Sequence, residues 1–128
     1  MSYIYAFEKL EVYKLGRTLN VLVYKISEKF PDIEKFGLTL QIRRASISVC
    51  SNISEGASKP SYKEQARFTE ISYNSLMEVL NDLILANDLE FIRDDEVRNF
   101  RILIEELGNK LNAYRNYQLK KFRQTRKK

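Results

Sequence analysis

The chain has 128 residues, with 22 Lys and Arg against 17 Asp and Glu, no His, one Cys and no Trp. This length suits one domain with one hydrophobic core, and a lone Cys excludes a disulfide framework within the chain and fits a reducing cytoplasm. No apolar run approaches the roughly 20 residues that span a bilayer, and no basic-then-apolar leader opens the sequence, so we expect a cytoplasmic protein without a membrane partner.

Apolar residues spaced three and four apart predict two helices in the first half of the chain. Their apolar stripes are Val12, Leu15, Leu19, Leu22, Val23, Ile26 and Phe30 in the first, and Leu38, Ile42, Ala45, Val49 and Ile53 in the second. The first is expected over residues 9–30 and ends before Pro31, because the residue ahead of a proline avoids helical geometry. The second is expected over residues 37–55, where Gly56 can provide the C-terminal stop.

Two further helices are predicted in the second half, each with a recognisable start. Ser61 and Glu64 fit a capping box at the start of a helix over residues 61–89. Asp94 is a good N-cap for a helix over residues 94–122, and the acidic residues that follow it complement the positive end of the helix dipole. No segment alternates with the period of two that indicates a strand.

Four helices joined by short connections indicate an all-α fold, an antiparallel up-down-up-down four-helix bundle. We assign residues 1–122 to this bundle and residues 123–128 to a basic tail. Connections this short leave no room for long crossovers, so helices adjacent in sequence are expected to be antiparallel neighbours.

The net charge of +5 is concentrated at the C-terminal end. Residues 115–128 hold seven bases and no acid and carry +7, whereas the other 114 residues hold 15 bases and 17 acids and carry −2. Such an end can bind RNA or DNA, and the aromatic residues among the bases suit a single strand. It can equally be a solvated helix end whose cations complement the dipole. The candidate nucleic-acid-binding residues are Arg115, Lys120, Lys121, Arg123, Arg126, Lys127 and Lys128.

A polar stripe accompanies the apolar stripe of the second predicted helix. Three uses are open for it: a polar network between helices or subunits, plain surface, or a ligand groove. Adjacent helical residues point about 100° apart, which argues against Arg43 and Arg44 clamping one phosphate together. The residues of this candidate polar network or subunit interface are Gln41, Arg43, Arg44, Ser48, Asn52 and Glu55.

The residue types argue against an enzyme. Without His, neither a Ser/His/Asp or Cys/His set nor the Glu-x-x-His pairs of a di-metal bundle can form. Cys50 falls among bundle-forming residues and is expected to be a buried, inert thiol. No phosphate-binding glycine loop is present, so we expect no catalysis, no cofactor and no metal.

The second predicted helix also carries a recognisable pattern. Residues 36–39 (FGLT), 41–45 (QIRRA) and 51–56 (SNISEG) resemble the signature of the 23S rRNA intervening-sequence protein family, also called bacterial four-helix bundle proteins. Two residues depart from the family pattern: Cys50 stands where the family usually has proline, and Asn74 in the third predicted helix stands where glycine is common. Further similar segments flank the signature: residues 7–13, residues 29–31, Ser72, Ser75, Leu76 and Glu78.

The resemblance covers roughly residues 7–92 and implies a four-helix bundle that forms a homo-oligomer, a pentameric ring in members of the family. The family name describes where some of its genes lie, inside 23S rRNA genes. A related bundle is an accessory subunit of reverse transcriptases, which is an analogy for RNA or DNA association. We therefore predict a non-enzymatic oligomeric interaction scaffold that binds RNA or DNA through its basic end. The alternative is a module that binds a protein partner or is purely structural, without nucleic-acid binding.

Overall fold

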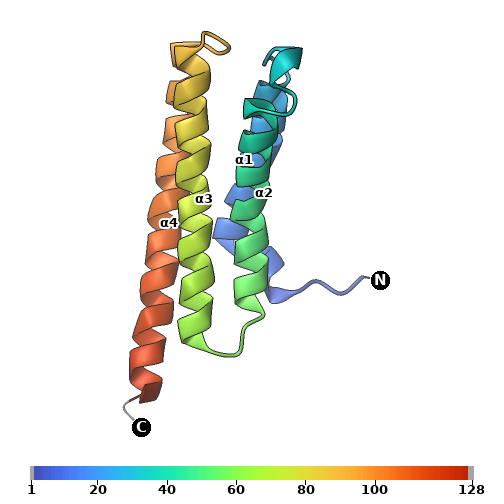
Figure 1. Cartoon of the computed structure of the whole chain (residues 1–128). Coiled ribbons are helices and arrows are strands. Elements are labelled where there is room, and N and C mark those ends of the chain that lie inside the picture. The colour runs from blue at the N-terminus through green and yellow to red at the C-terminus, as the bar shows by residue number, and fades with distance from the viewer. Residues whose placement is uncertain (1, 127–128) are drawn as a thin grey trace.

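The computed structural model describes residues 2–126, and in that part of the chain it shows four α-helices and no strand. The elements are η1 (Ala6–Lys9), α1 (Glu11–Ser27), η2 (Asp32–Glu34), α2 (Leu38–Ala57), α3 (Tyr62–Asp88) and α4 (Asp94–Arg126), where η1 and η2 are short 3-10 helices. In Figure 1, α1 lies beside α2 and α3 beside α4, with each helix reversing the direction of the one before it. The predicted all-α four-helix bundle is confirmed.

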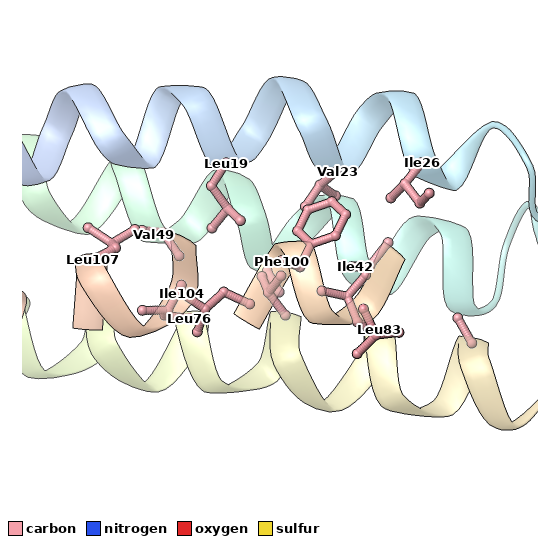
Figure 2. Close-up of a cluster of buried hydrophobic side chains, with 14 of the residues drawn as sticks. Leu19, Val23, Ile26, Ile42, Val49, Leu76, Leu83, Phe100, Ile104 and Leu107 are labelled. Carbon is pink, nitrogen blue, oxygen red and sulfur yellow. The ribbon is translucent and has the colours of Figure 1, made fainter. Parts of the chain in front are cut away.

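The buried side chains of the four helices meet along the axis of the bundle. Figure 2 shows Leu19 and Val23 of α1, Ile42 of α2, Leu76 of α3 and Ile104 of α4, among others, pointing into one shared core. All five apolar positions predicted for α2 are buried, whereas Leu22 of the stripe predicted for the first helix is exposed on α1. An amphipathic helix gains its stability mainly from burying its apolar face.

α1 is shorter than predicted at both ends. The backbone of Leu10 is extended, with φ −65° and ψ 134°, so the α-helix begins at Glu11 and the preceding residues form η1. At the other end the helix stops at Ser27, yet the Phe30 side chain still turns inward and is buried in the core. Periodicity therefore identified Phe30 as a core residue although it lies outside the helix.

Gly56 does not end α2 in the predicted way. It is helical and its φ is negative, so it does not adopt the left-handed conformation for which glycine is favoured in a helix stop. Instead, a Cβ at this position would lie 2.7 Å from the Cβ of Phe68. The missing side chain lets α2 and α3 approach closely near their connection, and the helix ends one residue later at Ala57.

α4 extends to Arg126, past the predicted end at residue 122. Arg123 and Arg126 therefore lie on a helix and not in a separate tail, because neither glycine nor proline interrupts the segment and cations are favourable near a helix C-terminus. Its 33 residues make α4 about 50 Å long, against about 26 Å for the 17 residues of α1. The ion pair between Lys110 and Glu11, 3.0 Å long, marks where α1 begins, so the last third of α4 extends beyond α1 and lies against α3.

Candidate functional site

A polar seam runs along the contact between α2 and α3. The hydroxyls of Ser48 and Ser75 share a hydrogen bond of 2.8 Å, and Asn52 donates its side-chain amide to the Ser48 hydroxyl at 2.9 Å. The buried Ser72 donates to the backbone carbonyl oxygen of Val49 at 2.8 Å. Serine is small and its hydroxyl can be satisfied locally, so this seam holds two helix backbones close together without a large apolar side chain between them.

The seam continues to a buried carboxylate, that of Asp82. Gln41 donates to its Oδ1 at 3.0 Å, whereas its Oδ2 is buried without a hydrogen-bond partner among the described residues. Burial raises the pKa of Asp82 to about 6, with a further increase from the neighbouring Glu78, while the amides of Asn81 and Gln41 oppose the shift. The sequence analysis missed Asp82, although Ser72, Ser75, Val79, Asp82 and Ala86 follow one helical stripe.

A groove of about 470 Å³ opens beside this seam, at the end of the bundle where α2 begins. Arg44 and Glu78 bring opposite charges to its walls, and Phe36 stands at its edge with 83% of its surface exposed. The groove is also lined by Gly37, Leu40, Gln41, Ala45 and Ser48. An open groove with one exposed aromatic ring and two opposite charges resembles the edge of a protein interface more than an enclosed small-molecule pocket.

Arg43 and Arg44 have separate surroundings, as the geometry of a helix predicts. Arg43 turns toward α1, where its Nε donates to Ser27 Oγ at 2.8 Å and a terminal nitrogen donates to the Tyr24 carbonyl oxygen at 3.3 Å. Its guanidinium also lies 4.6 Å from the centre of the Tyr24 ring. Arg43 is therefore a bracing contact between α1 and α2, whereas Arg44 is exposed at the groove.

The six polar residues predicted on the second helix do not form one network. Gln41, Ser48 and Asn52 belong to the seam with α3, Arg43 faces α1, and Arg44 lines the groove. Glu55 is exposed near the connection to α3, two turns beyond Ser48. The six residues lie on one helix, but the packing of neighbouring helices divides them among the seam with α3, the contact with α1, the groove and the exposed surface.

The predicted basic end is a surface of α4. Lys120, Arg123 and Arg126 are exposed on this helix. Arg115 is half-buried and is bonded to Glu70 of α3 at 3.2 Å, so it belongs to the α3–α4 contact more than to the exposed surface. Lys121 is half-buried, with its ammonium 5.7 Å from the centre of the Tyr117 ring. Lys127 and Lys128 lie outside the described residues.

One further base, Lys63 on the first turn of α3, joins this surface, and two others, Lys59 and Arg67, lie over the ring of Phe68 on α3; none of the three was among the predicted binding residues. Lys63 lies 5.9 Å from the centre of the Phe122 ring of α4, and Lys59 and Arg67 lie 5.1 and 5.8 Å from that of Phe68. Cations over aromatic faces are attracted by the ring quadrupole. Only the antiparallel packing of α3 on α4 brings Lys63 to the end of α4, since the two are far apart in sequence.

The chain matches the family model of the 23S rRNA-intervening sequence protein over residues 8–113. The chain belongs to this family. Among curated proteins, none matches it. As a member of the 23S rRNA-intervening sequence proteins, it has the polar seam and the groove inside the matched region, whereas Lys120, Arg123 and Arg126 lie beyond it.

In this 23S rRNA-intervening sequence protein, Cys50 lies within an unbroken α2. Its thiol is half-buried against α1, and burial raises its pKa to about 11, with the positive charge of Arg17 opposing the increase. Such a thiol is protonated near neutral pH and is a poor nucleophile. Of the helices that the structure describes, none is long and apolar enough to cross a membrane.

Proposed function

We propose that this protein is a non-enzymatic homo-oligomeric scaffold that binds single-stranded nucleic acid through its basic end. The observation that carries the proposal is the joint basic surface of α3 and α4. Lys63 on the first turn of α3 lies 5.9 Å from the centre of the Phe122 ring of α4, and the last turns of α4 expose Lys120, Arg123 and Arg126. Backbone phosphates bind such surfaces through charge, and most of that affinity comes from counterion release.

The aromatic residues of this surface favour a single strand over a duplex. Tyr117 and Phe122 each lie within 6 Å of a Lys or Arg side chain, and Tyr117 is exposed. Bases of a single strand can stack on aromatic side chains, and neighbouring cations follow the phosphates. Glu55 and Glu64 lie near this end and reduce its net charge, which leaves an excess of bases.

Homo-oligomerisation would increase the affinity by presenting several basic ends at once. Family membership supports assembly, and so do large apolar side chains that a single copy leaves exposed, among them Ile33 and Phe36 near the start of α2. Several weak contacts on one strand act at a high effective concentration and can raise the affinity by orders of magnitude. Light scattering that shows a single species of 15.1 kDa would contradict the oligomer.

The test of nucleic-acid binding is a titration of labelled single-stranded RNA at several salt concentrations. A fourfold variant, Lys120→Gln, Lys121→Gln, Arg123→Gln and Arg126→Gln, is expected to lose at least about tenfold in affinity at low salt. The slope of log binding constant against log salt concentration should become less steep by up to about 3, since each phosphate contact on a single strand contributes about 0.7 to that slope. Single-stranded DNA and duplex RNA serve as comparison probes.

The matched control removes the same charge elsewhere, at four bases that are exposed on α1 and α4. Its affinity should stay within about threefold of the wild type, because long-range charge contributes less than contact. Equal losses in both variants, or wild-type binding that is insensitive to salt, would show that the basic end is not the binding surface. The control variant is Lys14→Gln, Lys25→Gln, Arg98→Gln and Arg101→Gln.

A second candidate function is the binding of a protein partner through the groove between α2 and α3. Phe36 at the groove edge and the opposite charges of Arg44 and Glu78 favour it. A pull-down with the wild type should then recover a partner, whereas Phe36→Ser should not. The fourfold glutamine variant of the basic end should recover that partner as well as the wild type does.

A further inference from the structure

The first residues of the described chain form an arm that is not packed on the bundle. Tyr3 and Tyr5 are 77% and 61% exposed, and Ile4 between them is exposed as well. The backbone of Tyr5 is extended, with φ −76° and ψ 154°. In Figure 1 this arm, residues 2–5, leaves the bundle near the start of α1 and points away from all four helices.

Aromatic contacts and one hydrogen bond hold the arm in this orientation, pointing away from the bundle. Tyr3 packs edge-on against Tyr5 at 4.9 Å between ring centres, and Tyr5 lies 6.3 Å from Phe7. Phe7 in turn packs edge-on against Tyr13 of α1 at 5.0 Å. The backbone N–H of Tyr5 donates to the Glu8 carboxylate at 2.7 Å. These contacts hold three large apolar side chains out in solvent, which costs free energy unless another surface covers them.

A groove of about 320 Å³ lies between α1 and α2 on the outer face of the bundle. Val21 of α1 and Ile47 of α2 are both exposed on its walls. Its other lining residues are mostly polar: Tyr13, Arg17, Asn20, Cys50, Ser51 and Ser54. A tyrosine side chain suits such a mixed surface, because its ring is apolar and its hydroxyl needs a polar partner.

We propose that the arm of one copy lies in the α1–α2 groove of a second copy. This inference rests on the proposed homo-oligomer and assigns the contact that builds it. The chain's own groove is a poorer site, because Tyr13 lines that groove and already holds Phe7, from which the arm leads away. The occupant is thus the same segment on a neighbouring copy.

The area of the arm fits a contact within a larger interface. An aromatic side chain buries about 150–250 Å², so Tyr3 and Tyr5 together contribute about 300–500 Å² of the roughly 800 Å² that each partner of a stable interface buries. The remainder comes from the helix faces beside the groove. Because arm and groove are different surfaces, the contact is head-to-tail, and copies joined in this way close into a ring when the rotation permits.

Disulfide cross-linking between two differently tagged, co-expressed chains tests the proposal, with the native thiol removed by Cys50→Ser in both. One chain carries Ile4→Cys in the arm, and the other carries Ile47→Cys in the groove. A disulfide requires Cα atoms within about 7 Å, so it forms quickly only if the arm reaches the groove. The expected result is a mixed dimer that forms at least about tenfold faster than with Ile102→Cys, an exposed position on α4.

A single chain with both Ile4→Cys and Ile47→Cys distinguishes a neighbour's groove from the chain's own. Contact between copies gives a covalent ladder that ends at the size of the ring, whereas an arm that folds back gives a disulfide-linked monomer and overturns the inference. Val21→Cys provides a second groove position if Ile47→Cys fails to fold. Light scattering on the reduced proteins separates the two proposals: an oligomer without the cross-link refutes only the arm contact, and a monomer refutes both.

Discussion

Gln41 of α2 donates its side-chain amide to Oδ1 of Asp82 of α3 across 3.0 Å, while Oδ2 of the same carboxylate is buried and has no hydrogen-bond partner within residues 2–126. The charge of Asp82 is therefore only partly compensated. The side chain of Asp82 is fully buried, and the nearby Glu78 is a like charge. Asp82 is a point where the bundle gives up stability to keep a polar group between two helices.

The first prediction is that the free energy of unfolding falls as pH rises through this carboxyl's titration. The pKa of Asp82 is about 6 in the folded protein, above the ordinary value of 3.8. Between those values the folded state binds more protons than the unfolded state, so protonation stabilises the fold and the effect is lost above pH 6. The shift corresponds to a loss on the order of 3 kcal/mol between pH 4 and pH 7.

Asp82→Asn should remove most of this pH dependence and raise stability at pH 7 by roughly 1–2 kcal/mol, because the amide is uncharged and still accepts from Gln41. Denaturant unfolding at a series of pH values measures both effects. The matched control is Glu106→Gln on the exposed face of α4. Its free energy of unfolding should depend on pH in the same way as that of the wild type. If the stability of Asp82→Asn changed with pH as much as that of the wild type, groups other than Asp82 would be responsible for the pH dependence.

The second prediction concerns the end of α3, where Glu90 adopts a left-handed backbone with φ 63°. The N–H of Phe91 donates to the Ala86 carbonyl oxygen and that of Glu90 to the Asn87 carbonyl oxygen, both at 2.9 Å, as in a Schellman motif. Glycine is favoured at this position, and a side chain there costs on the order of 1 kcal/mol. Glu90→Gly should therefore stabilise the protein by about 0.5–1 kcal/mol in thermal or denaturant unfolding.

Glu90→Ala is the control for this change. It removes the same charge but keeps a Cβ and therefore the strain, so its stability should stay within about 0.5 kcal/mol of the wild type. Equal gains from glycine and alanine would point to the charge of Glu90 instead of its backbone.

The third prediction contrasts two helical glycines. A Cβ at Gly56 would lie 2.7 Å from the Cβ of Phe68, whereas one at Gly108 would lie 3.4 Å from a ring carbon of Tyr73. Gly56→Ala must push α2 and α3 apart and should cost about 1–3 kcal/mol. Gly108→Ala meets ordinary contact distance and gains helix propensity, so it should be neutral or stabilising by up to about 1 kcal/mol. Unfolding of both variants in denaturant tests the contrast, which fails if the two changes have the same sign.

The fourth prediction separates the adjacent arginines. Arg43 donates to Ser27 and to the Tyr24 carbonyl and lies over the Tyr24 ring, so Arg43→Ala should destabilise the protein by about 1–3 kcal/mol. Arg44 is exposed at the groove, and Arg44→Ala should change stability by less than about 0.5 kcal/mol. Thermal unfolding of the two variants compares them directly, and similar losses would show that Arg44 is also a bracing residue.

Much of the fold could be read before the structure was known. The apolar stripe of α2, from Leu38 to Ile53, is buried at every predicted position, and Ser61 accepts the backbone N–H of Glu64 at 3.1 Å as the start of α3 requires. Helical spacing and capping are local properties, so a single sequence contains them. The same local signals placed the end of α4 four residues too early, because no residue type marks that end.

Which residues come together in the candidate sites depends on the neighbouring helix that each face contacts. Composition and helical periodicity are enough to predict a helical bundle with a polar stripe on α2 and an excess of bases at the C-terminal end. The tertiary structure decided that Asp82 is buried beneath Gln41, that Arg43 and Arg44 serve different surfaces, and that Lys63 joins the end of α4. Periodicity defines which face of a helix a residue occupies, but only the packing of helices distant in sequence defines what that face meets.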